Sequence, residues 1–198
     1  RGGPPSDVNA YLKINPDGRV TCLVGKVELG QGSKTALAQL LAEELDVELD
    51  AVDMVMGDTD QCPWDGGTYG SLSVRSFGPL LRGAGAEARA ALLQMAAEKL
   101  QEPPERLSVK AGVVSGSKGK VSYAQLVGGR RIERRLEKTP VKPVSAYTVV
   151  GQSPRRKDAL EKVTGRAQFA ADISLPGMLH ARILRPPAHG AVLREVDT

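Results

Sequence analysis

Two glycine-rich stretches hold the residues whose types and spacing suit ligand binding. The GQG segment Gly30–Gly32 stands between a β-prone run, residues 19–25, and a helical pattern, residues 34–45. Glycine accepts positive φ and has no Cβ to keep a ligand away, and the amide of Gln31 both donates and accepts hydrogen bonds. The free N–H groups at the start of the helix suit an anion, and Ser33 is the expected N-cap.

A second stretch, residues 66–76, reads GGTYGSLSVRS and also leads into a helical pattern, residues 77–100. A dinucleotide needs polar groups at separated points, and two such loops facing one cleft would supply them. From spacing alone, a plain turn or a solvated loop stays the alternative, because glycine fingerprints have many false positives. The candidate ligand-binding residues are Gly30, Gln31, Gly32, Gly70, Ser71, Leu72, Ser73 and Arg75.

A small sheet and the two helices are the elements that must position these loops. Apolar alternation predicts strands over residues 8–14 and 19–25, joined as a hairpin by Asn15–Gly18. A third strand is predicted over Val52–Met56, shorter strands over parts of residues 107–122, and two more strands over residues 167–171 and 179–184. We therefore predict an α+β fold, a mixed sheet with two main helices.

Composition narrows the class of protein. The chain has 198 residues, 41% hydrophobic and 25% charged, which is typical of a globular protein of one or two domains. It holds no run of about 18 apolar residues, so no membrane-spanning segment is predicted. Cys22 and Cys62 lack metal-site spacing and are expected to be free thiols, and Trp64 is expected in the core. Because residue 1 is Arg1, we expect that a preceding piece is missing; the compartment stays open.

Charge is uneven: residues 1–100 carry net −5 and residues 101–198 net +9. The basic run from Arg130 to Lys138 alternates with glutamates and holds no aromatic side chain, unlike a surface that binds nucleic acid. We expect a solvated or subunit-facing helix end there, and no nucleic-acid partner. Three prolines between residues 140 and 154 predict a linker over residues 129–154.

Three blocks of the sequence resemble a known family, that of the xanthine dehydrogenases and aldehyde oxidases, in the large subunit of isoquinoline 1-oxidoreductase type. Its molybdopterin-binding segments are similar to GKVELGQGSKTALAQLLAEEL and TYGSLSVRSFGPLLRGAGAEAR. The start of its hammerhead domain is similar to VVGQSPRRKDALEKVTGRAQFAADISLPGMLHARILRPPAHGAVL. The resemblance implies a molybdopterin-cofactor-binding-like domain over residues 1–128, the linker, and the start of a second, incomplete α/β hammerhead-like domain over residues 155–198.

The resemblance also implies a chemistry. In that family molybdenum is held by a molybdopterin, commonly the cytosine dinucleotide, and an N-heteroaromatic or aldehyde substrate is hydroxylated with oxygen from water. Electrons leave through iron–sulfur clusters on a small [2Fe-2S] partner subunit. By this likeness Gln31 and its glycine neighbours face the molybdenum end or the pterin. Residues 70–73 hold the pterin or phosphates, with Arg75 as a further candidate.

Departures from the family keep other functions open. The family's base glutamate lies near the C-terminus of the large subunit, and nothing in this chain matches its motif. No catalytic residue and no metal-ligating side chain is therefore assigned. We expect an N-terminal fragment that needs the remainder of the large subunit and is inactive alone. The alternatives are a non-catalytic structural or interface module, including a structural duplicate of the cofactor domain, and a general nucleotide-binding domain.

Overall fold

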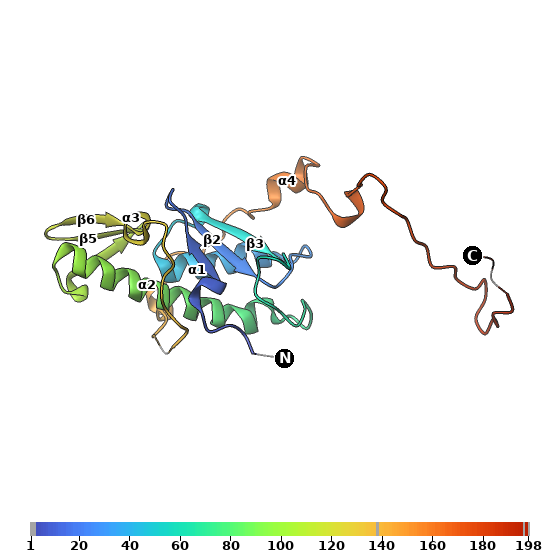
Figure 1. The fold of residues 1–198 in the computed structure, drawn as a ribbon, viewed down its shortest axis with the longest axis horizontal. Helices are drawn as coiled ribbons and strands as arrows, with labels where there is room; N and C mark the ends of the chain where they lie inside the picture. Colours follow the sequence, from blue (N-terminus) through green and yellow to red (C-terminus); the bar gives the residue numbers. More distant parts are fainter. Residues whose placement is uncertain (1–2, 138, 196, 198) are drawn as a thin grey trace. The chain divides into compact units, whose positions relative to one another are not determined.

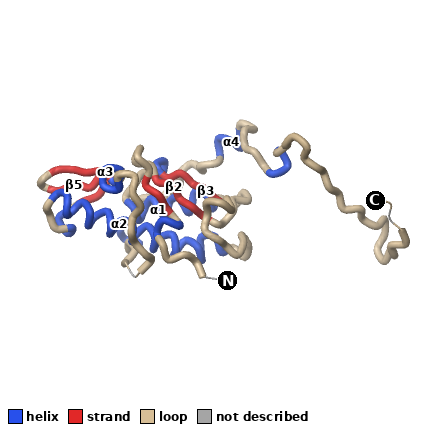
Figure 2. The backbone as a smooth tube through the Cα atoms, viewed as in Figure 1, coloured by secondary structure: helices blue, strands red, loops and turns tan. Residues whose placement is uncertain are grey.

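The computed structural model describes residues 3–137, 139–195 and 197, which divide into two compact units with a boundary after Leu160. The described helix pattern contains no segment with the length and apolar character needed to cross a bilayer. Figures 1 and 2 show how the elements follow one another along the chain. The strands are β1 (Leu12–Ile14), β2 (Val20–Val24), β3 (Val52–Met56), β4 (Ser108–Lys110), β5 (Val113–Gly116) and β6 (Gly119–Ser122). The α-helices are α1 (Ser33–Leu45), α2 (Gly78–Leu100), α3 (Tyr123–Val127) and α4 (Ala159–Val163).

The first sheet has the order β1-β2-β3 and mixes both strand orientations. β1 and β2 form the predicted antiparallel hairpin, with Leu12 opposite Cys22. β2 and β3 are parallel, and α1 makes the crossover that a parallel pair requires. The predicted mixed sheet with two main helices is thus confirmed. The predicted first strand was too long, because Val8–Ala10 form a 3-10 helix that Asp7 caps.

Helices α1 and α2 pack on each other and on this sheet around one apolar core. Figure 1 shows α2 running along the first unit toward β5 and β6. The two helices come close at Gly85, where an added Cβ would lie 2.8 Å from Cβ of Glu44. The buried apolar side chains of these elements include Leu12, Val20, Cys22, Val24, Leu37, Ala38, Leu41, Leu45, Leu81, Ala84, Ala88 and Leu92.

A second, antiparallel sheet of order β4-β5-β6 leads into α3. Ser122 caps α3 by accepting from Gln125 N, and the Gln125 side chain accepts from Ser122 N in return. The buried hydroxyl of Tyr123 donates to Leu45 O at 3.0 Å. This bond ties α3 to the C-terminal end of α1.

The basic run predicted as a helix end is extended chain instead. Val8 N donates to Arg134 O at 3.2 Å, and Arg131 pairs with Asp7 at 2.6 Å. The backbone of this run forms hydrogen bonds to the N-terminal segment instead of along a helix. The helix predicted from the alternating charges is therefore wrong. Lys138, the last member of the predicted run, lies outside the described residues.

Residues 129–137 and 139–158, here called the strap, cross the first unit and are held by carboxylates of the two long helices. Glu87 accepts from Glu137 N at 3.1 Å and Thr139 N at 3.0 Å. Glu44 accepts from Lys142 N at 3.1 Å, and both glutamates are buried. The segment predicted as a linker is therefore bonded along the first unit, while the domain boundaries at residues 128 and 154 stay predictions.

Glu43 holds the next part of the strap. Its side chain is buried, with a residue exposure of 1%. The carboxylate accepts from the amides of Thr148, Val149 and Val150 at 2.9, 2.7 and 2.8 Å. The Lys142 ammonium lies 3.6 Å from it and also pairs with Asp46. A buried carboxylate with several donors is far less costly than an unpaired one.

The second unit, residues 161–198, forms no strand within its described residues. The strands predicted over residues 167–171 and 179–184 are therefore wrong for this structure. Apolar side chains such as Leu179 remain up to 93% exposed. A strand forms stably only when neighbours share its hydrogen bonds and cover its apolar face, and this unit supplies neither.

We expect Glu43→Gln to lower the free energy of unfolding at pH 7 by about 1.5–3 kcal/mol, the usual value of a hydrogen bond to a charged group. Burial raises the pKa of the Glu43 carboxyl, but the three strap amides and Lys142 outweigh it, so its pKa lies below the ordinary value. A lowered pKa means that the stabilisation is present above about pH 4.3 and is lost as the pH falls through the folded pKa.

Urea unfolding at pH 7 and at pH 3 measures this effect. The stability difference between wild type and Glu43→Gln should narrow at the lower pH. Exposed Glu48 gives the matched control, since Glu48→Gln removes the same charge from a side chain outside the strap contacts. An equal loss in both variants would contradict the role of Glu43.

Alanine substitutions at two glycines of α2 should change the stability of the protein in opposite directions. Gly83→Ala should stabilise the protein by about 0.5–1 kcal/mol, because no heavy atom lies within 4 Å of the added Cβ and alanine favours helix. Gly85→Ala should destabilise by about 1–3 kcal/mol, because its Cβ meets Glu44 Cβ. Thermal unfolding of both variants checks this, and effects of the same sign would refute the close approach of α1 and α2.

Candidate functional site

The GQG loop connects β2 to α1 in the left-handed conformation that its glycines permit. Gly30 has φ +107° and Gly32 has φ +85°. The residue at the N-cap position of α1 is Gly32, and Ser33 is the first residue of the helix. The prediction that Ser33 is the N-cap is therefore wrong. The Ser33 hydroxyl instead donates to Glu28 at 3.3 Å.

Glu28 occupies the place at the start of α1 where the sequence predicted a bound anion. One carboxylate oxygen accepts from Gly30 N at 2.8 Å and Gly32 N at 2.9 Å, and the other accepts from Lys34 N at 2.8 Å. Burial raises the pKa of Glu28, but the amide hydrogen bonds outweigh it and hold the pKa below its ordinary value. The anion at this helix end belongs to the chain itself.

Both the oxygen and the nitrogen of the Gln31 side-chain amide form hydrogen bonds within the GQG loop. Its oxygen accepts from Leu29 N at 2.5 Å, and its nitrogen donates to Val27 O at 3.0 Å. The side chain is nevertheless exposed, so a ligand can reach it. A ligand that bonds to Gln31 must therefore replace hydrogen bonds that the loop already makes.

The second loop enters α2 through strained backbone. Gly70 has φ +64° and Ser71, a non-glycine residue, has φ +57°. Residues Ser73–Phe77 form a π-helical turn directly before α2. Left-handed non-glycine residues and π turns are both uncommon and occur often at functional sites. Ser71 and the turn therefore mark this loop independently of its composition.

Lys26 joins the two loops. Its buried ammonium donates to Asp65 Oδ1 and to Gly67 O, both at 2.7 Å. Next to it, Val27 N donates to the hydroxyl of Thr68 at 2.8 Å. Nothing in the sequence pattern pointed to Lys26, because 39 positions separate it from its partner carboxylate. The lysine fixes the spacing between the two loops.

Gly25 supplies the one sequence signal that such a contact exists. A Cβ there would lie 2.5 Å from Pro63 O and 2.6 Å from Asp65 Cβ, so only glycine fits. Between those two residues Trp64 is 68% exposed, and the prediction of a core tryptophan is wrong. Trp64 lies on the segment that returns toward the loops and is not beneath an apolar layer.

Both predicted loops line one hollow of about 390 Å³. Of the predicted ligand-binding residues, Gln31, Gly32, Ser71 and Ser73 line it, whereas Gly30, Gly70, Leu72 and Arg75 do not. Its lining contains hydroxyls, one amide and apolar groups and no charged side chain. The lining residues are Leu29, Gln31, Gly32, Ser33, Ala36, Thr68, Tyr69, Ser71, Ser73 and Val74.

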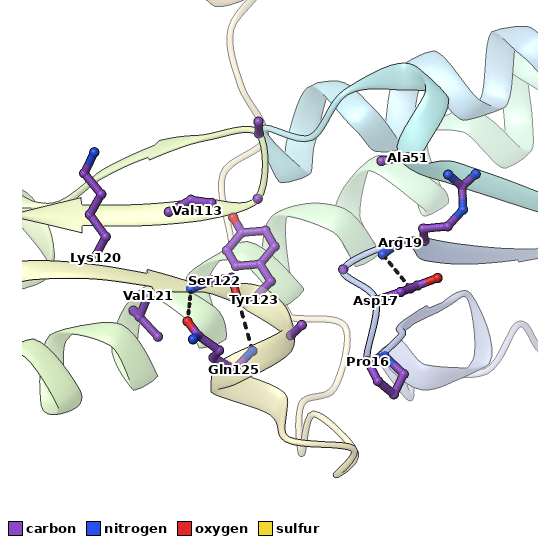
Figure 3. Close-up of a pocket in the computed structure, with 14 residues that line it drawn as sticks. Pro16, Asp17, Arg19, Ala51, Val113, Lys120, Val121, Ser122, Tyr123 and Gln125 are labelled. Carbon is purple, nitrogen blue, oxygen red and sulfur yellow. Dashed lines mark hydrogen bonds between the residues drawn. The ribbon is translucent and has the colours of Figure 1, made fainter.

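A larger hollow of about 650 Å³ lies between the hairpin turn and the second sheet (Figure 3). Several of its polar side chains are bonded to nearby groups. Ser122 and Gln125 bond to each other's backbone, Asp17 accepts from Arg19 N, and the Arg19 guanidinium pairs with Asp53. None of the predicted ligand-binding residues lines this hollow. Its larger volume alone therefore does not make it the candidate site.

Titratable side chains form no metal centre in the part of the chain that the structure describes: no three His, Cys, Asp or Glu gather as ligands. Cys22 is buried and Cys62 half-buried, and both are free thiols, as predicted. Burial raises the pKa of the Cys22 thiol, which keeps it protonated and unreactive. The lining of the candidate site thus offers a ligand neutral polar groups and apolar surface.

Comparison with known proteins assigns the family. Residues 2–173 match the model of the molybdopterin cofactor-binding domain. The chain is 41% identical over 182 residues to a nicotinate dehydrogenase subunit of Pseudomonas putida, covering 91% of this chain and 15% of that protein. It is 30% identical over 231 residues to the beta subunit of isoquinoline 1-oxidoreductase of Brevundimonas diminuta, covering 96% and 30%.

Solved structures agree with this result. The CO dehydrogenase from Oligotropha carboxidovorans superposes with a TM-score of 0.52 at 28% identity, over 59% of this chain and 15% of that one. The chain thus spans less than a third of the length of each of these relatives. With its two loops, its mixed sheet and a family match over most of its length, the chain belongs to the molybdopterin-binding domains of the xanthine dehydrogenase family.

Proposed function

We propose that this chain is part of the large subunit of a molybdenum hydroxylase and that the hollow between its two loops contacts one end of a molybdopterin dinucleotide. The observation that carries the proposal is that both loops singled out in the sequence line the same hollow. Nicotinate and isoquinoline, which name two relatives, are N-heteroaromatic compounds. These names support an N-heteroaromatic substrate, with an aldehyde as the other class.

The lining of the hollow suits a neutral ring better than phosphate groups. The hydroxyls of Thr68, Ser71 and Ser73 and the amide of Gln31 match the donor and acceptor edge of a heterocycle. Phosphates favour cations or free amides, and Glu28 already takes the amides at the start of α1. At about 390 Å³ the hollow is at the small end of ligand sites and holds only part of a dinucleotide.

The cofactor, when bound, would supply the hydroxylation, with oxygen from water. The residues of this chain bind and orient it, and none of them is proposed as acid or base. We further propose the cytosine dinucleotide form, electron exit through iron–sulfur clusters of a small [2Fe-2S] partner subunit, and the remainder of the large subunit as the other wall of the site. The partial volume of the hollow supports such a second wall.

A structural module of the same large subunit is the second candidate. The bonds of Gln31 within its own loop and the carboxylate of Glu28 at the helix start favour it, because both groups are satisfied without any ligand. The general nucleotide-binding domain is less well supported. A nucleotide's phosphates would meet no cationic side chain in the hollow.

Gln31→Ala separates the first two candidates. In the intact subunit we expect about twofold to tenfold weaker cofactor retention, because a ligand bond to Gln31 replaces bonds to Val27 O and Leu29 N and its net value is then about 0.5–1.5 kcal/mol. The measurement is molybdenum and pterin content per subunit, together with kcat. Exposed Gln94 on α2 provides the control. Gln39 is unsuitable because its amide donates to Val149 O and Gln152 O. Wild-type values for Gln31→Ala would favour the structural module.

The chain by itself should show no hydroxylase activity with any aldehyde or N-heterocycle. The reason is that it presents one partial wall of the site and no candidate base. Assay of the purified chain after loading with molybdenum cofactor, with and without the remainder of the large subunit, is the measurement. Turnover by the chain alone would overturn the proposed division of labour.

A further inference from the structure

The strap ends on the GQG loop through Arg156. The Arg156 guanidinium donates to Gly30 O at 3.0 Å and to Asp158 at 3.0 and 2.9 Å. One of its terminal nitrogens lies 3.5 Å from the Glu28 carboxylate. The side chain of Asp158 is 9% exposed and that of Arg156 40%. One guanidinium thus contacts both a loop carbonyl and the carboxylate that holds the loop amides.

The neighbouring residue fixes the strap to the other side of the helix start. Lys157 N donates to the hydroxyl of buried Thr35, the third residue of α1, at 3.0 Å. The Lys157 ammonium donates to Leu49 O at 3.0 Å. Arg156 therefore approaches the loop from a backbone that is itself anchored, and its direction is set by α1.

We propose that Glu28 and Arg156 are positioning residues of the GQG loop, Glu28 as a resident anion that orders the loop amides and Arg156 as the strap residue that fixes the Gly30 carbonyl. Neither residue lines the hollow, so each acts on a ligand only through the loop. Their effect on the cofactor rests on the proposed function. Their effect on the loop does not.

Glycine loops have wide conformational freedom, and this explains why such a lock is needed. With Gly30 and Gly32 both at positive φ, the loop backbone has many alternative conformations of similar energy. Three amide bonds to Glu28 select one of them, and that conformation places Gln31 and Gly32 on the hollow. Without the anion, the amides of Gly30, Gly32 and Lys34 lose their acceptor together.

Amide hydrogen exchange in the ligand-free intact protein tests the resident anion. Glu28→Ala should speed exchange of the Gly30, Gly32 and Lys34 amides about tenfold to a hundredfold, and added acetate should slow it again by restoring a carboxylate acceptor. Acetate should leave the wild type unchanged. Glu28→Gln provides a second variant if the alanine variant fails to fold. Unchanged exchange, or faster exchange that acetate does not reverse, would overturn the proposal.

Arg156→Lys tests the strap contact, with exposed Arg155→Lys as the matched control. Lysine keeps the charge but carries its donors on a single nitrogen, whereas Arg156 bonds to Gly30 O and Asp158 from three different nitrogens. We expect faster loop exchange and at least severalfold lower pterin content for Arg156→Lys only. Equal behaviour of the two variants refutes the role of Arg156. A wild-type subunit that carries no pterin refutes the proposed function instead, while the exchange results still decide the lock.

Discussion

Buried carboxylates that accept backbone amides are the interaction on which the first unit depends. The strap is about thirty residues with little regular secondary structure, so its N–H groups have few partners of their own kind. Glu87, Glu44 and Glu43 supply acceptors from α1 and α2, and each of them would be costly to bury without those donors. The two helices and the strap therefore satisfy each other's hydrogen-bonding groups.

The same arrangement recurs at the candidate site. Proceeding along the strap, the amide donors meet Glu87, then Glu44, then Glu43, and the chain then reaches Glu28 through Arg156. Glu43 and Glu44 lie near the C-terminal end of α1, whereas Glu28 lies at its start. The strap is therefore bonded near both ends of the helix that carries the GQG loop.

Local pattern predicted the elements but not the contacts between them. The order β2-α1-β3 and the long helix α2 followed from periodicity, and their bounds differ from the expected ones by one residue at most. Both loops were recognised because glycine and hydroxyl residues cluster in sequence. The roles of Glu43 and Glu44 were hidden, since adjacent glutamates in a helix look like a solvated face. Their acceptor function depends on amides about one hundred positions away, and amides carry no side-chain signature.

Where prediction failed, a long-range contact or its absence decided the outcome. Trp64 is exposed because its neighbours Pro63 and Asp65 pack against Gly25, which leaves the Trp64 side chain outside the core. The helix start that was expected to suit an anion is occupied for a related reason: Glu28, only two residues before the GQG loop, folds back onto it.

The hydrogen bonds within the GQG loop also limit the binding free energy that a ligand can gain from the hollow. Any hydrogen bond to Gln31 replaces bonds to Val27 O and Leu29 N, so its net contribution is a difference between similar terms. Exposed apolar side chains in the lining of the hollow can contribute binding free energy without such a loss. Leu29 is 71% exposed and Tyr69 is 67% exposed, and covering such side chains contributes about 25 cal/mol for each Å² of apolar surface removed from water. For the ligand proposed here, we therefore expect the covered apolar side chains to supply most of the affinity, and the Gln31 amide and the hydroxyls of Ser71 and Ser73 to set its orientation.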